Sequence, residues 1–157
     1  MKYILVDSAL LYMLESFPRK AVPNLYNSFC DKCDVGEIIC EKESKKSMDN
    51  LLEEETSFEW MKEHSKMFRP ITQKESKILG ELVSEGVFDF VNKTNAFERN
   101  IPVTIPFVFA IAISEERVIV ADKKSRDYSI ISSLCKKKDI KLMEIDDFLS
   151  KISLEEE

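Results

Sequence analysis

The stretch Tyr3-Ile4-Leu5-Val6-Asp7-Ser8-Ala9-Leu10-Leu11-Tyr12-Met13-Leu14 decides the fold. Its first four residues are apolar and end at an acid, which is typical of a buried strand that is bounded by a polar turn. Beyond the acid, apolar residues recur at the spacing of one helical face: Leu10, Met13, Leu14 and Phe17. The stretch therefore predicts a central strand that ends at Asp7 and leads directly into a helix.

Asp7 is the first candidate functional residue, because ligands of open α/β sheets bind at the carboxyl ends of the strands. A carboxylate at this point can cap the helix that begins at Ser8. It can also hold a divalent metal ion. The residues leave both roles open.

The rest of the chain alternates short apolar runs with helical patterns. Further strands are predicted at residues 38–40, 118–120 and 140–143. A buried helix is predicted from Pro106, and a polar loop at residues 92–100. Two capping boxes, Thr56 with Glu59 and Thr72 with Glu75, predict helix starts. This alternation predicts an α/β fold with three layers, in which helices cover both faces of a mainly parallel sheet.

Composition and charge narrow the class of protein. The 157 residues are 44% hydrophobic and 33% charged, which predicts a single domain over residues 1–157, with a frayed acidic tail at 153–157. A net charge of −6 argues against a general electrostatic attraction to nucleic acid, but it allows a local basic patch. The chain shows no signal peptide and no apolar run near the ~20 residues of a membrane span. We therefore expect a cytoplasmic protein with no membrane partner.

The ordered set of segments resembles PIN-like domains, and most closely the DUF4411 group, which is often encoded with toxin–antitoxin modules. Residues 3–8 resemble the opening strand of that group with its first acid, and residues 35–40 resemble its second strand. Residues 59–68 resemble its helix with Trp and Phe. Residues 106–112 and 118–120 resemble the helix and strand that follow. The resemblance covers nearly the whole chain and implies a PIN-like α/β/α fold.

The resemblance also implies an acidic site that this chain retains only in part. Active PIN domains gather three or four carboxylates around Mg²⁺ or Mn²⁺, which activates a water against an RNA phosphodiester. Asp7 matches the first acid, whereas Ser47, Ile105 and Lys123 stand at the other three positions. Glu43 and Asp122 lie near two of those positions and could replace the lost acids. Asp7, Glu43 and Asp122 are thus the candidate catalytic residues, with Asp7 the metal ligand if a metal site exists.

Cations gather at the mouth of the expected site. Lys123, Lys124 and Arg126 follow the third predicted strand, where they would repel Mg²⁺ and suit a phosphate instead. The resemblance and its departures favour a catalytically degenerate relative without a cofactor, which binds RNA or a protein such as a cognate antitoxin, or forms a homodimer. The alternative is an active Mg²⁺- or Mn²⁺-dependent endoribonuclease, the toxin of a toxin–antitoxin pair.

Overall fold

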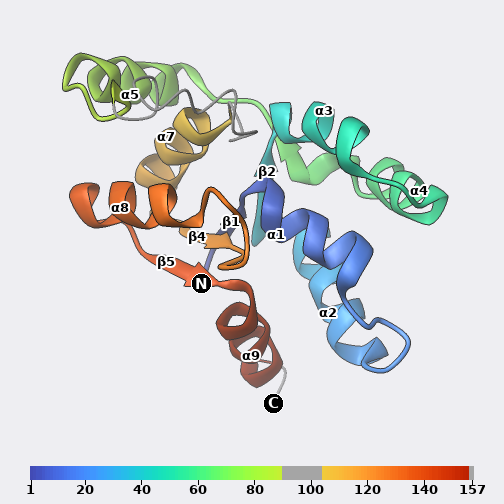
Figure 1. Ribbon diagram of the computed structural model, residues 1–157. Helices are drawn as coiled ribbons and strands as arrows, with labels where there is room; N and C mark the ends of the chain where they lie inside the picture. Colours follow the sequence, from blue (N-terminus) through green and yellow to red (C-terminus); the bar gives the residue numbers. More distant parts are fainter. Residues whose placement is uncertain (90–103, 156–157) are drawn as a thin grey trace.

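The computed structural model describes residues 1–89 and 104–155 (Figure 1). The strands are β1 (Tyr3–Leu5), β2 (Ile38–Glu41), β3 (Phe68–Arg69), β4 (Val118–Ala121) and β5 (Leu142–Glu144). The α-helices are α1 (Asp7–Leu11), α2 (Pro23–Asp34), α3 (Lys42–Leu51), α4 (Glu55–Glu63), α5 (Gln73–Ser84), α7 (Ile105–Glu115), α8 (Tyr128–Lys138) and α9 (Ile145–Glu155). A π-helical turn, η1 (Tyr12–Ser16), continues α1, and a 3-10 turn, η2 (Ser65–Met67), precedes β3. The loop predicted at residues 92–100 lies outside the described residues.

The five strands form one parallel sheet in the order β3-β2-β1-β4-β5. β1 is central, with Tyr3 opposite Ile38 on one side and Val118 on the other. Helices connect the strands and cover both faces of the sheet (Figure 1). The α/β class and the parallel sheet predicted from the sequence are therefore confirmed.

Successive residues of β1 face opposite layers, as the two-residue period of a strand requires. Tyr3 and Leu5 pack in a core with residues of α1, α2, α4 and α9, among them Leu10, Phe29, Trp60 and Phe148. Ile4 and Val6 pack in a second core with α5, α7 and α8. Since both faces are covered, the strand is apolar throughout, and its first polar residue is Asp7 at its carboxyl end.

Three local features differ from what the sequence pattern indicated. The helix after β1 begins at Asp7, with Val6 as the N-cap residue and no side-chain cap, so Asp7 does not cap the helix. Thr56 lies inside α4, which begins at Glu55 without a side-chain cap. The sequence pattern also missed β3, whose two residues are too few to show a period. The second capping box is confirmed, because Thr72 and Glu75 bond reciprocally at the start of α5.

The end of the chain also differs from the prediction. α9 continues to Glu155, so residues 153–155 are helical, where a frayed tail was expected. Residues 156 and 157 lie outside the described part of the chain.

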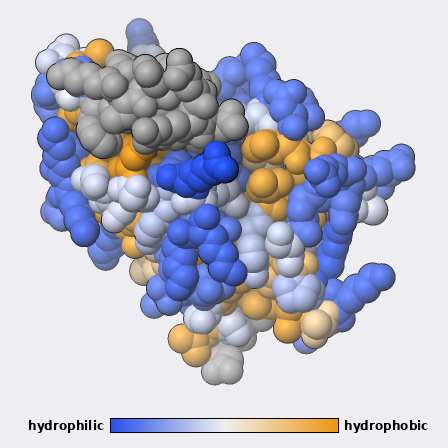
Figure 2. Space-filling view, in the orientation of Figure 1, coloured by the Kyte–Doolittle hydropathy of each residue, from blue (hydrophilic) through white to orange (hydrophobic). Residues whose placement is uncertain are grey.

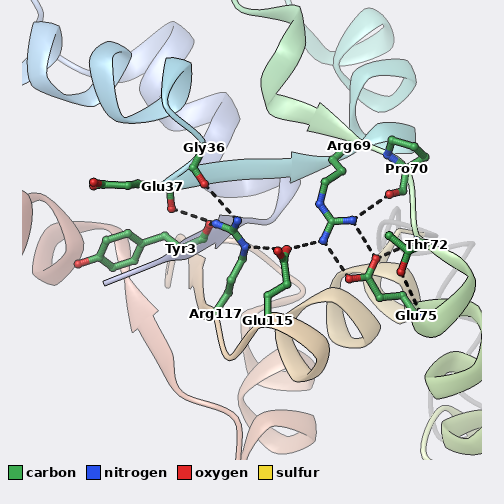
Figure 3. Close-up of polar contacts among 9 residues, drawn as sticks. All are labelled: Tyr3, Gly36, Glu37, Arg69, Pro70, Thr72, Glu75, Glu115 and Arg117. Atoms are coloured by element: carbon green, nitrogen blue, oxygen red, sulfur yellow. Dashed lines mark hydrogen bonds and ion pairs between the residues drawn. The ribbon is translucent and has the colours of Figure 1, made fainter.

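An ionic network runs from the amino ends of β1 and β2, through α7, to Arg69 at the end of β3 (Figure 3). The buried guanidinium of Arg117 donates hydrogen bonds to the carbonyl oxygens of Tyr3, Gly36 and Glu37, each at 3.1 Å. Arg117 Nε also bonds Glu115 at 3.0 Å, and Glu115 in turn contacts Arg69. Arg69 forms two bonds with the buried carboxylate of Glu75, at 2.8 and 2.9 Å. The network therefore fixes β1 and β2 to α7 and α5.

The surface seen from the side of Figure 1 is largely hydrophilic, with hydrophobic residues in small groups between (Figure 2). Among the described residues, no helix is both long enough and apolar enough to cross a bilayer.

Candidate functional site

Asp7 lies at the carboxyl end of the central strand and is 3% exposed. The preceding residue, Val6, donates its backbone N–H to the carbonyl of Val120 at 3.0 Å, which joins β1 to β4 at this point. Asp7 Oδ1 is fully buried and has no well-formed hydrogen bond to any described residue. Ionising a buried carboxyl group costs free energy when one of its oxygens has no hydrogen-bond donor. Burial is accordingly the main cause that raises the pKa of Asp7 to about 6.

Two serine hydroxyls from α3 lie beside this carboxylate. Ser44 and Ser47 interact with Asp7 and partly offset the rise in its pKa. The two serines are three residues apart, so they share one face of α3. Ser44 is completely buried, and its Oγ also lacks a well-formed partner among the described residues. The side of the site formed by α3 thus presents hydroxyls to Asp7.

Asp127 is a second buried carboxylate of the site and is 4% exposed. It is the N-cap residue of α8, and it accepts a hydrogen bond from the Ser125 hydroxyl within the β4–α8 loop. Its charge acts on Asp7 and contributes to the raised pKa of that carboxyl. The loop therefore brings together two carboxylates that are 120 positions apart in the sequence.

Glu41 is a third buried acid at this edge, since it ends β2 and is 3% exposed. Burial is the main cause that raises its pKa, and the charges of Glu43 and Asp7 add to the rise. Its carboxylate is engaged, however, because Oε2 accepts the backbone N–H of Glu43 at 2.7 Å and so caps α3. Glu41 thus adds negative charge near Asp7 while its side chain is occupied by the helix.

The candidate catalytic residues Glu43 and Asp122 are held by other partners. The Glu43 carboxylate lies 3.3 Å from the Lys46 ammonium in a solvent-exposed ion pair on α3. Asp122 follows β4, where its backbone N–H bonds Ser8 Oγ at 3.1 Å and its Oδ1 accepts the Lys124 N–H at 3.0 Å. Within residues 1–89 and 104–155, no three His, Cys, Asp or Glu side chains are grouped to hold a metal ion. The described residues therefore do not fit the carboxylate cluster of an active PIN domain.

The position expected for the third acid is filled by a core side chain. Ile105 begins α7 and is buried in the core formed with α5 and α8. Thr104 precedes it and is completely buried. The Thr104 hydroxyl does not cap α7 and has no partner among the described residues.

The predicted phosphate-binding cations lie on the β4–α8 loop, next to the site. Lys123, Lys124 and Arg126 are exposed. Lys123 lies 3.5 Å from the Glu144 carboxylate at the end of β5. On the other flank, α3 exposes Lys42, Lys45 and Lys46. The two elements that border Asp7 thus both carry exposed cations.

Sequence reasoning missed Asp127, Glu41 and Ser44. Asp127 lies six residues beyond the last residue of β4, and only the course of the loop turns it back to the buried edge. Glu41 lies one residue beyond the strand predicted at residues 38–40, although it ends β2. One signal was available for Ser44, because a serine three residues before Ser47 shares its helical face.

Comparison with known proteins gives no assignment, because no family model matches the chain and no curated protein matches it significantly. The PIN-like resemblance stays a prediction.

Proposed function

We propose that this protein is a PIN-like domain that binds RNA through the carboxyl edge of its sheet and no longer cleaves it. The observation that carries the proposal is the environment of Asp7. Hydroxyls of Ser44 and Ser47 face this carboxylate. Of the two neighbouring acids, Glu41 caps α3 with its side chain. Asp127 makes no side-chain cap and accepts a hydrogen bond from the Ser125 hydroxyl. A divalent cation that activates water needs several converging oxygen anions.

The acids beside Asp7 are few. With a pKa of about 6, the Asp7 carboxyl is partly protonated in weakly acidic solution. An ion bound there would lower that pKa, but two carboxylates offer it few protein ligands. The buried site is therefore better suited to shaping the edge of the sheet than to holding a metal.

The cations that border the site support RNA as the bound molecule. Lys124 and Arg126 on the loop and Lys42 and Lys45 on α3 are exposed in a chain whose net charge is negative. Lysine and arginine side chains contact phosphates and supply most of the sequence-independent affinity of nucleic-acid-binding proteins. These exposed cations form a local basic surface that can bind RNA although the net charge of the chain is negative.

One observation favours a second candidate, a metal-dependent endoribonuclease. Asp7 Oδ1 is a buried acceptor without a well-formed partner, and the Asp127 carboxylate is close enough to act on it. These two acids would then be the protein ligands, with Asp122 and Glu43 held elsewhere by Lys124 and Lys46. In this candidate the cation would polarise the scissile phosphate and a bound water.

RNA binding with and without divalent ions separates the two candidates. Fluorescence anisotropy of a labelled single-stranded RNA should give the same affinity in EDTA and in Mn²⁺ if the domain binds through its cations alone. It should also give the same affinity for the wild type and for Asp7→Asn. An affinity that requires Mn²⁺ and is lost in Asp7→Asn would contradict the proposal and support the nuclease. No measurable binding in either condition would reject RNA as the partner.

A further inference from the structure

A cavity of about 460 Å³ opens at the amino ends of β4 and β5, at the edge of the sheet opposite Asp7. The ends of α7 and α8 line it, and both helices end there at a residue with left-handed backbone, Glu116 (φ 53°) and Asp139 (φ 55°). A residue in this conformation ends a helix and turns the chain sharply. Because β4 and β5 are paired neighbours, the two turns that precede them lie side by side and form the cavity together.

The lining of this cavity is in large part apolar. Ala112 and Val118 are buried, whereas Ile113 and Ile140 are only partly buried. Both isoleucines pack against the core formed with α5, α7 and α8, and both line the cavity. Ligand sites are mainly apolar cavities of roughly 300 to 1,000 Å³. The cavity is thus large enough for an apolar side chain together with its adjoining main chain.

Lysines surround the cavity. Lys138 and Lys141 line it. Lys138 is paired with Glu85 at 2.9 Å, whereas Lys141 is exposed and forms no ion pair with a described residue. Further exposed lysines adjoin the lining residues along the chain, namely Lys2, Lys136 and Lys137. The acids of the lining, Glu116 and Asp139, offset only part of this positive charge. An apolar cavity with a basic rim suits an apolar side chain that is flanked by acids.

The end of α9 carries this combination of residues. The apolar residues Phe148, Leu149 and Ile152 recur on one face of α9 and are buried. Leu154 comes two residues later, on the other side of the helix, and is 64% exposed. In the sequence it is followed by three glutamates, at positions 155–157. Since the Leu154 side chain is exposed, it does not occupy the cavity of its own chain and is available to another copy.

We propose that residues 154–157 of one copy bind in this cavity of a second copy, with the Leu154 side chain against the apolar lining and the glutamates beside the lysines. An exposed apolar side chain that fits a pocket elsewhere on the same protein links copies head to tail. The opposite charges at the rim speed the encounter and fix the orientation of the bound segment. The contact is independent of RNA binding, because the cavity and the candidate site lie at opposite edges of the sheet.

Sedimentation velocity over a series of protein concentrations tests the inference. The wild-type chain should associate as its concentration rises, and high salt should weaken the association because it screens the charges at the rim. Leu154→Ser should weaken the association about tenfold, since it removes the apolar side chain that the contact buries. Leu51→Ser is the matched control, because Leu51 is a 48% exposed leucine at the end of α3, and it should leave the association unchanged.

Charge reversal and mixing locate the two halves of the contact. Lys141→Glu should weaken the association, whereas Lys45→Glu makes the same charge change at an exposed position of α3 and should not. The Leu154→Ser chain keeps the intact cavity, and the Lys141→Glu chain keeps the leucine. An equimolar mixture of these two variants should therefore associate more strongly than either variant alone. A wild-type chain that stays monomeric at every concentration, an association that either variant leaves unchanged, or a mixture that associates no better than its parts would overturn the inference.

Discussion

Asp127, at the start of α8, lies within electrostatic range of Asp7, at the end of β1, and both carboxylates are buried. Burial is the main cause that raises the pKa of Asp7, and the charge of Asp127 adds to the rise. Regions that keep such groups usually serve function at a cost in stability. This pair, and the hydroxyls that surround it, distinguish the carboxyl edge of the sheet from the rest of the molecule.

Asp7→Asn should stabilise the protein at neutral pH. The folded Asp7 carboxyl, with a pKa of about 6, holds a proton that the unfolded carboxyl, with its ordinary value of 3.8, has already released between these pH values. The free energy of unfolding therefore falls as pH rises from about 4 to about 6. Above that range, the ionised group costs up to about 3 kcal/mol.

Urea denaturation of the wild type and of Asp7→Asn at several pH values measures this effect. The variant should be more stable at neutral pH and nearly equal to the wild type near pH 4. Asp49→Asn, at an exposed position of α3, is the control and should change little at any pH. If Asp7→Asn destabilises the protein at neutral pH, the Asp7 carboxylate makes favourable contacts that the described environment does not contain.

The double variant Lys124→Ala/Arg126→Ala should weaken RNA binding. Each cation that contacts a phosphate of a single strand contributes about 0.7 to the slope of log affinity against log salt concentration. The double variant removes two such cations and should therefore lower the slope by about 1.4. Lys136→Ala/Lys137→Ala makes the same charge change at the other end of α8 and should leave the slope nearly unchanged. An equal loss of slope in both variants would show attraction by net charge alone.

Arg117→Met should strongly destabilise the fold. The change leaves the carbonyl oxygens of Tyr3, Gly36 and Glu37 without the guanidinium that bonds them. Loss of one partner from a buried ionic group costs about 3 to 5 kcal/mol. Lys46→Met, which removes an exposed ion pair with Glu43, should cost less than about 1 kcal/mol. Chemical denaturation measures the free energy of unfolding of both variants. Similar losses of stability in the two would show that the network stabilises the fold no more than a surface ion pair does.

The apolar runs predicted the fold well because each buried strand needs two apolar faces. β1, β2 and β4 appear in the sequence as short runs that end at polar residues, and the parallel sheet follows from the helices between them. The sequence could not show that Asp127 lies near Asp7, since the path of a loop leaves no periodic pattern of residues. The sequence also allowed Asp7 a capping role, whereas the helix begins one residue earlier than expected and leaves the carboxylate buried.

Arg117 illustrates a second kind of limit. Its side chain is 5% exposed, although a charged residue before a strand is normally taken for a surface position. Three backbone carbonyls from two other segments make that burial favourable, and they meet only in the folded sheet. Contacts between distant segments of this kind have no signature in local composition.

The most direct test of the central claim is an RNA cleavage assay in Mn²⁺ with binding measured in the same reaction. A labelled single-stranded RNA is incubated with the wild-type chain, with Asp7→Asn and with Asp127→Asn, and the products are separated by gel electrophoresis. The account predicts that RNA is bound by all three proteins and recovered at full length from each. Cleavage by the wild type that disappears in Asp7→Asn and Asp127→Asn would contradict it.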